Sequence, residues 1–223
     1  MDILSPAQRR LWPQLRPTGS LGMVLYGGTA IALRLGHRPS ADFDFFTDKP
    51  LDKEALNGAI PSIRQSVVLQ DSSSSYTLLV PHEASRDEYV KVSFFGAINV
   101  GRVGEPAYTE DHVLQVASLD DLMATKVKAV LQRIEAKDYM DIAALVKAGV
   151  SVAKGLAAAR LMYGQSFQPS ESLKAMVYFE GGDLAILPWD IRETLIEAAS
   201  GVRDLPPVEL LTRTLALPAQ PVP

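Results

Sequence analysis

Hydrophobic and polar positions divide the chain into a first part with strand-like runs and a second part with helical spacing. The apolar runs in the first part are short and bounded by glycine or polar residues, which is typical of strands at 21–26, 42–47, 65–70, 76–80 and 89–95. The serine run 72–75 is typical of a hairpin loop. From Ser118 to Ile134, apolar residues recur at spacings of three and four, which predicts one amphipathic helix. Further helices are predicted at 138–147, 152–162, 170–179 and 189–199.

Helix signals also occur in the first part. Ser5-Pro6 is a capping residue followed by proline at the first helical position, and Pro13 or Pro17 should interrupt that helix. Helices are also predicted at 29–35, ending at Gly36, and within 50–64. The fold class is therefore α/β (α+β), with an α/β lobe over 1–115 and a helical lobe over 116–223. The proline-rich end after Leu205 is either a docking segment or disordered, and Trp12 and Trp189 are expected to anchor the core.

Composition restricts the chemistry that the chain can perform. With 223 residues, 47% of them hydrophobic, the chain can bury a substantial core. Cysteine is absent and there are three histidines, so a metal ion would be bound by oxygen ligands. No apolar stretch approaches the roughly 18–20 residues of a membrane helix, so we expect no membrane partner and a cytoplasmic location. A net charge of -4 gives no global attraction to nucleic acid but permits a local basic stripe.

Two carboxylates stand at alternate positions of the predicted strand 42–47. Side chains alternate between strand faces, so Asp42 and Asp44 point the same way with about 7 Å between their Cα atoms. Phe43, Phe45 and Phe46 are expected on the opposite, buried face. A carboxylate pair backed by a core is suited to hold Mg²⁺, with Mn²⁺ as the alternative ion.

A glycine turn precedes this strand by one short helix. Gly27, Gly28 and Thr29 follow a buried strand and open a helix, so their backbone N–H groups and the positive helix end can hold the phosphates of a nucleoside triphosphate (NTP). Either motif alone has a plainer explanation, since two glycines often form a tight turn and DxD occurs by chance. Their order, with a phosphate cradle beside an acidic strand, is much more specific.

At this point the sequence resembles nucleotidyltransferases with the polymerase-β-like fold, which carry a glycine turn and then DxD on the next strand. The segments LYGGTA (25–30) and RPSADFDF (38–45), followed by DLMATK (121–126) and KDYMD (137–141), are similar to the AbiEii-type toxin family. The resemblance implies a mixed-sheet nucleotidyltransferase lobe followed by a helical lobe, with Arg38 and Ser40 lining the site. It also implies an RNA acceptor such as a tRNA 3′ end, and growth inhibition that an antitoxin encoded nearby holds off.

The second part supplies further candidates. Lys126, Arg133 and Lys137 are spaced i, i+7 and i+11, so they share a stripe if the helix is continuous. Such a stripe either neutralises the phosphates of a nucleotide or is an ordinary solvated helix face. Asp138 could orient Lys126, ligate the metal ion or act as the base for the acceptor hydroxyl.

One position departs from the superfamily pattern. Many polymerase-β-like enzymes have a third carboxylate on a later strand, where this chain has Ser93. Either two carboxylates suffice, or Asp138, Asp141 or Glu88 contributes, or the enzyme is impaired.

Three hypotheses for the function follow. The first is a Mg²⁺-dependent nucleotidyltransferase that moves a nucleoside monophosphate from an NTP to an acceptor, with RNA as the acceptor and the role of a toxin. The second keeps this chemistry but modifies a protein side chain. The third is a non-catalytic module that binds nucleotide or RNA.

Overall fold

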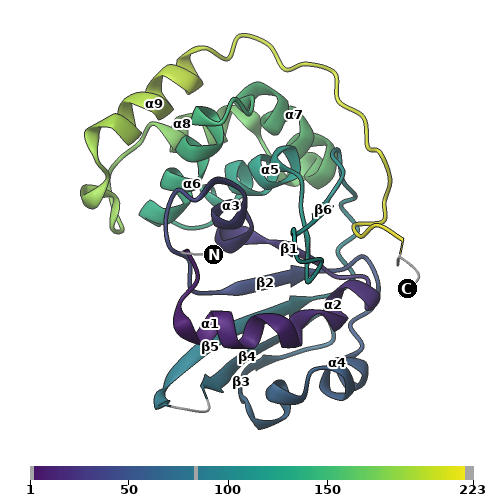
Figure 1. Ribbon diagram of the computed structural model, residues 1–223. Coiled ribbons are helices and arrows are strands. Elements are labelled where there is room, and N and C mark those ends of the chain that lie inside the picture. Colours follow the sequence, from purple (N-terminus) through teal and green to yellow (C-terminus); the bar gives the residue numbers. More distant parts are fainter. Residues whose placement is uncertain (1–2, 83–84, 219–223) are drawn as a thin grey trace. The chain divides into compact units, whose positions relative to one another are not determined.

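The computed structural model describes residues 3–82 and 85–218, which form two compact units (Figure 1). The first unit contains the described parts of Met1–Gly101, Glu105–Ala117 and Thr212–Pro223. The second contains Arg102–Gly104 and Ser118–Leu211. The first unit is thus assembled from three separate pieces of the chain.

Within the described residues, the first unit is built on a sheet of seven strands in the order β3-β4-β5-β2-β1-β7-β6. Their bounds are β1 Val24–Tyr26, β2 Phe43–Phe46, β3 Val67–Asp71, β4 Ser75–His82, β5 Ser85–Phe95, β6 Ala107–Tyr108 and β7 Gln115–Val116. The sheet is mixed, because β2 is parallel to β5 and β1 to β7, while the other neighbours are antiparallel. The predicted α/β class is confirmed, as is the serine loop between β3 and β4.

Local sequence signals explain where the helices of this unit begin and end. The side chain of Ser5 caps α1 (Pro6–Leu11). Pro13 and Pro17 both interrupt the helix, so that η1 (Trp12–Leu15) and α2 (Pro17–Ser20) follow as separate short elements. Helix α3 (Gly27–Leu35) starts two residues earlier than predicted and ends at Gly36, whose φ of 63° is left-handed. The predicted helical segment 50–64 contains α4 (Lys53–Ala59) and extends into η2 (Pro61–Gln65).

Aromatic side chains form the core on one face of the sheet. Phe43, Phe45 and Phe94 are fully buried there, and the ring of Trp12 lies 6.1 Å from that of Phe43. Burial of one such ring stabilises the fold by about 1.5–3 kcal/mol. The expectation for Phe46 was wrong, because alternation places it on the face of Asp44, where it stacks on Tyr26 at 4.7 Å.

The chain returns to the first unit after the second is complete. The backbone N–H of Leu215 donates to Asp48 at 2.9 Å, and that of Leu217 donates to Gln115 at 2.8 Å. The side chain of Leu215 is 1% exposed. Residues 212–218 are therefore a docking segment, which was one of the two alternatives for the end of the chain.

The second unit is helical. Its helices are α5 Leu119–Ala129, α6 Ala136–Lys147, α7 Val152–Tyr163, η3 Gly164–Ser166, α8 Pro169–Met176, η4 Leu184–Ile186 and α9 Trp189–Ser200. The prediction of one helix through Ile134 was wrong, because α5 ends at Ala129 and a loop precedes α6. Trp189 was also misjudged, since it is 71% exposed.

A buried carboxylate fixes the beginning of α5. Asp121 is 1% exposed and accepts hydrogen bonds from the backbone N–H groups of Val103 at 2.8 Å and Gly104 at 3.2 Å. The hydroxyl of Ser118 donates to the same carboxylate at 2.6 Å. Burial raises the pKa of Asp121 despite these hydrogen bonds. The short segment 102–104 is thereby attached to the helical unit.

Candidate active site

The carboxylate pair lies at the beginning of β2. Asp42 directly precedes the strand and Asp44 is its second residue, so both share the face opposite the buried rings of Phe43 and Phe45. Asp44 is paired in register with Tyr26 of β1 and Ser93 of β5. The aromatic core behind β2 thus holds the strand that presents both carboxylates.

The glycine turn lies directly against this pair. Gly27 begins α3 with a φ of 73°, a conformation that L side chains rarely adopt. A Cβ atom at Gly27 would lie 2.8 Å from Oδ2 of Asp44, so only glycine allows the backbone this close to the carboxylate. The first N–H groups of a helix have no acceptor within the helix, so this turn presents donors beside the acidic strand.

Thr29 fastens the loop that leads into the strand. Its hydroxyl contacts the hydroxyl of Ser40 at 2.8 Å and the carbonyl oxygen of Asp42. A carbonyl can only accept, so the hydroxyl of Thr29 is the donor to Asp42. Thr29 is 1% exposed, so its hydroxyl serves to hold this loop. Arg38, in the same loop, donates to the carbonyl of Pro39 at 3.0 Å.

Strand β5 brings two residues beside the carboxylates. Ser93 is the register partner of Asp44, so the serine stands where a third carboxylate would face the pair. Two residues earlier, Lys91 places its Nζ atom 3.8 Å from Oδ2 of Asp42. Sequence reasoning missed Lys91, although its alternation with buried Val92 and Phe94 places it on the face of Ser93.

Two carboxylates are a sufficient protein contribution for Mg²⁺. Magnesium is usually held by one or two carboxylates, several waters and the phosphates of the substrate. Among the described residues, no group of three or more histidine, aspartate or glutamate side chains is placed to hold a metal ion. Asp42 and Asp44 offer carboxylate oxygens, which are the type of ligand that Mg²⁺ takes.

The second unit contains a buried charge cluster. Lys126 is 4% exposed, and its Nζ atom lies 2.6 Å from Asp138 and 2.6 Å from Asp141, both fully buried. Arg133 donates to Asp138 at 2.7 and 3.0 Å. Burial acts to raise the pKa of Asp138, but the hydrogen bond from Arg133 and the charge of Lys126 outweigh it, and the pKa lies below its ordinary value. Asp138 is therefore held as an anion between two cations.

The predicted basic stripe is not formed on one helix. Lys126 belongs to α5, Arg133 to the following loop and Lys137 to α6. The turn between the helices nevertheless lets Lys126 and Arg133 meet at Asp138, while Lys137 pairs with Glu135 at 2.9 Å. Asp42 and Asp44 lie in the first unit and this cluster in the second.

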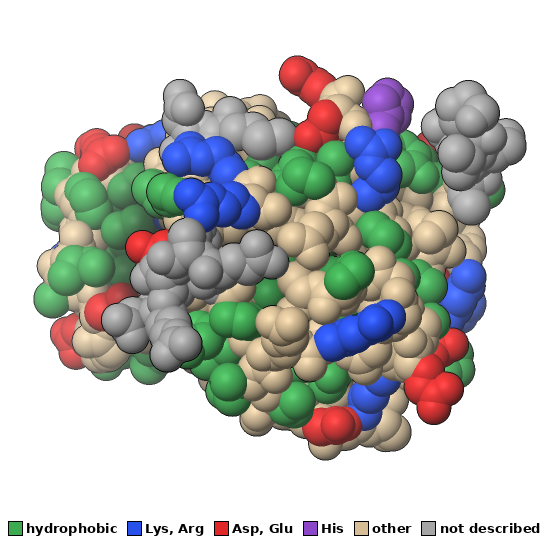
Figure 2. Space-filling model, turned by 60° about the horizontal axis from the view of Figure 1, so that its bottom comes forward, with side chains coloured by type: hydrophobic (Ala, Val, Ile, Leu, Met, Phe, Trp, Pro, Cys, Tyr) green, Lys and Arg blue, Asp and Glu red, His purple; other side chains and the backbone are tan. Residues whose placement is uncertain are grey.

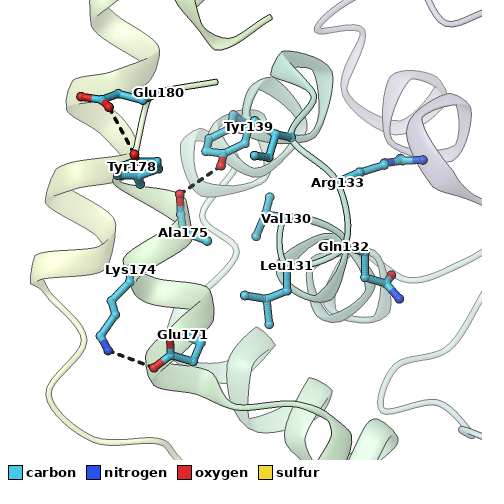
Figure 3. A pocket seen from close by; sticks show the side chains of 11 residues that line it. Val130, Leu131, Gln132, Arg133, Tyr139, Glu171, Lys174, Ala175, Tyr178 and Glu180 are labelled. Atoms are coloured by element: carbon cyan, nitrogen blue, oxygen red, sulfur yellow. Dashed lines mark hydrogen bonds and ion pairs between the residues drawn. The ribbon is translucent and has the colours of Figure 1, made fainter. Parts of the chain in front are cut away.

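A groove of about 510 Å³ adjoins Arg133 within the second unit (Figure 3). Figure 3 shows Leu131 and Val130 on one side and Glu171, Lys174 and Tyr178 on the other. Lys174 pairs with Glu171 at 2.9 Å, and the hydroxyl of Tyr178 donates to Glu180 at 3.2 Å. The charges in this groove are thus largely matched by their own neighbours.

Charged side chains are scattered over the one face of the molecule that the surface view displays (Figure 2). Figure 2 shows one face of the molecule, where Lys and Arg side chains stand in small separate groups among acidic and apolar ones. Within the described part of the chain, none of the helices has the length and apolar character needed to cross a membrane.

Comparisons with known proteins identify a matching family and solved structures with a similar fold. Residues 13–204 match the family described as Nucleotidyl transferase AbiEii toxin, Type IV TA system. An uncharacterized protein of Aquifex aeolicus (strain VF5) is 30% identical over 158 residues, which cover 70% of this chain and 73% of that protein. The fold is similar to MenT4, a nucleotidyltransferase toxin from Mycobacterium tuberculosis H37Rv, with a TM-score of 0.55, 14% identity and coverage of 86% of this chain and 82% of that one. It is also similar to an antigenic nucleotidyltransferase-like protein from Paracoccidioides brasiliensis, with a TM-score of 0.51, 15% identity and coverage of 77% and 87%.

Proposed function

Because this chain belongs to the AbiEii family of nucleotidyl transferase toxins and is thus a nucleotidyltransferase, we propose that it transfers a nucleoside monophosphate from an NTP to an RNA hydroxyl. Pyrophosphate is the leaving group, and the new bond joins the α-phosphate to the acceptor oxygen. The observation that carries the proposal is the close approach of Gly27 to Asp44, which places backbone donors beside a carboxylate pair.

Asp42 and Asp44 would hold Mg²⁺, or Mn²⁺ in its place. Once bound, the ion would supply positive charge beside the phosphate oxygens. Lys91 also lies beside this pair, with its Nζ atom 3.8 Å from Oδ2 of Asp42. The chain itself contributes the rigid placement of the two carboxylates on a strand that is anchored by buried aromatic rings.

The turn of Gly27, Gly28 and Thr29 would bind the β- and γ-phosphates through its backbone N–H groups. The bonds from Thr29 to Ser40 and Asp42 support this role, because they fix the turn and the acidic strand to one another. Arg38 and Ser40 would line the same site from the connecting loop. Catalysis in this arrangement would come from positioning and from stabilisation of charge.

The cations of the second unit would divide two tasks. The side chains of Arg133 and Lys137 are 47% and 48% exposed, so both cations would be accessible to an anionic ligand at the surface of the second unit. Lys126 is enclosed by Asp138 and Asp141. Both oxygens of Asp138 already accept from Lys126 or Arg133, which favours orientation of these cations over a role as general base.

The biological role would be growth inhibition, relieved by an antitoxin. Membership of a toxin–antitoxin family supports such a partner, and we propose a protein encoded nearby. The RNA acceptor, such as a tRNA 3′ end, would meet a protein of net charge -4. Binding of RNA should therefore depend on a few local cations and show a shallow dependence on salt.

Incubation with each labelled NTP, Mg²⁺ and total RNA tests the proposal. We expect label in RNA, and we expect Asp44→Asn to lower the rate by about 10²-fold or more. Asp71→Asn is the matched control, because Asp71 lies on a strand of the same unit with its side chain 56% exposed. Label in protein would instead identify a protein acceptor. If label enters neither polymer while Asp44→Asn still relieves toxicity in cells, nucleotide transfer is not the mechanism.

A further inference from the structure

Strand β5 presents two positions to the carboxylate pair, and neither of them is acidic. Strands β2 and β5 are parallel, and Asp44 is the register partner of Ser93. The same register, continued by two residues, brings Lys91 beside Asp42, because neighbouring strands lie about 4.8 Å apart. The backbone pairing therefore places a lysine next to one carboxylate and a serine next to the other.

The position of Lys91 is fixed at its backbone, while its ammonium group is accessible. Val90 and Val92, its neighbours in β5, are 3% and 0% exposed, so burial of the opposite face holds the strand. The side chain of Lys91 is 42% exposed, and its Nζ atom lies 3.8 Å from Oδ2 of Asp42. A lysine ammonium group is a compact charge on a flexible stem. Lys91 can therefore turn from Asp42 to another anion that binds next to it.

Lys91 also affects how many divalent cations the carboxylate pair can hold. In two-ion sites the cations lie about 3.5–4 Å apart, so anionic ligands must offset their mutual repulsion. Here the two carboxylates share their surface with an ammonium group, which would repel a second divalent cation at Asp42. Within residues 3–82 and 85–218, no set of three or more acidic or histidine side chains could hold a metal ion. The side chains present thus favour one divalent cation and one lysine.

Nucleotide transfer needs positive charge at the phosphates, and both lysine and Mg²⁺ can supply it. We propose that Lys91 binds the phosphates of the NTP and provides the positive charge that a second metal ion provides in two-ion sites. This inference rests on the proposed function, since it assumes that the triphosphate lies at Asp42 and Asp44. Before the NTP binds, the ammonium group pairs with Asp42, and afterwards it donates to a phosphate oxygen. Lys91 transfers no proton, so the balance of the reaction is unchanged.

Binding of Mn²⁺, followed through the electron paramagnetic resonance signal of the free ion, tests this role without turnover. In the absence of nucleotide, Lys91→Met should bind Mn²⁺ about two- to fivefold more tightly than the natural protein, because the competing cation is gone. A purely structural role would have the opposite effect, since a displaced strand would bind the ion more weakly. In the complex with an NTP analogue that has a carbon bridge between its α- and β-phosphates, we expect one Mn²⁺ per chain.

Transfer of label from NTP to RNA at saturating Mg²⁺ is the second measurement. Lys91→Met should lower the rate about 10²-fold, as for the loss of one group that stabilises charge in the transition state. Lys91→Arg keeps the cation and should retain most of the rate. Lys53→Met is the matched control, because Lys53 also pairs with an aspartate of the first unit, Asp71. Asp71 lies on β3, which β4 and β5 separate from β2, so this variant should bind Mn²⁺ and transfer label as the natural protein does.

Other results would overturn the inference. Two Mn²⁺ in the complex with the analogue would show that a second ion, not Lys91, supplies the charge. A normal transfer rate in Lys91→Met, with tighter binding of Mn²⁺, would show that Lys91 only pairs with Asp42, while the transferase function stands. Weaker binding of Mn²⁺ in the same variant would assign Lys91 a structural role. If the natural protein neither binds Mn²⁺ nor transfers label to any acceptor, the proposed function fails and the inference fails with it.

Discussion

Replacement of Lys126 by methionine tests whether the buried charge cluster contributes more to the free energy of unfolding than an exposed ion pair does. Met keeps most of the volume of the side chain but removes the cation between Asp138 and Asp141, two carboxylates that are fully buried. Loss of one member of a buried ion pair typically costs about 3–5 kcal/mol, because the remaining charge is no longer compensated. Arg133 still binds Asp138, so we expect a value at the lower end, about 3 kcal/mol, in the free energy of unfolding.

Urea unfolding at pH 7 would measure this cost, with Lys174→Met as the matched control. Lys174 pairs with Glu171 at the same kind of distance, 2.9 Å, but its side chain is 73% exposed. An exposed pair contributes at most about 1 kcal/mol, so the same substitution should have little effect there. Similar losses for the two variants would refute the view that burial makes the cluster strong.

The dependence on pH gives a second check on the Lys126 variant. The pKa of Asp138 is below its ordinary value of 3.8, so its contribution to stability is present above pH 3.8 and is lost as the pH falls through the folded value. Without Lys126 this pKa rises, so the variant loses less stability on acidification. The deficit of Lys126→Met against the natural protein should therefore shrink as the pH falls from 7 to below 4. A deficit that stays constant over this range would show that lost packing, not charge, causes it.

Two pairs of glycine substitutions test other parts of the fold. Gly27→Ala and Gly36→Ala both place alanine at positive φ, which costs about 1–2 kcal/mol, but only Gly27→Ala adds an atom 2.8 Å from Asp44. Nucleotide transfer, measured with labelled NTP, should fall about 10²-fold or more in Gly27→Ala and little in Gly36→Ala, and equal rates would contradict the role of the turn. Among helical glycines, Gly155→Ala would overlap the side chain of Met123 and should destabilise by about 1–3 kcal/mol in urea unfolding. Gly58→Ala meets nothing and should stabilise by up to about 1 kcal/mol, so a loss of stability there would show that the helix propensity argument fails.

Much of the first unit could be predicted because its signals are local. A capping serine with proline, a glycine at a left-handed position and alternation of acids with phenylalanines each act within a few residues. Strands β6 and β7 have two residues each, too few for any periodicity to show. They form because β7 pairs with β1 and β6 pairs with β7, which are contacts between residues distant in the sequence.

The second unit shows where periodicity misleads. Apolar spacing continues through Leu131 and Ile134, yet these residues are 37% and 48% exposed and lie beyond the end of α5. No glycine or proline marks that end. The ionic contacts of Asp138 with Lys126 and Arg133 join residues from both sides of the turn, and such tertiary contacts leave no trace in local spacing. The roles of the site residues in nucleotide transfer stay predictions until the variants are measured.

The docking of residues 212–218 on the first unit has a consequence for synthesis of the protein. Leu215 belongs to the core of the first unit but is translated only after the whole of the second unit, 118–211. Domains usually fold in the order in which they leave the ribosome. Here the unit with Asp42 and Asp44 can complete its core only after the whole of the helical unit has been synthesised.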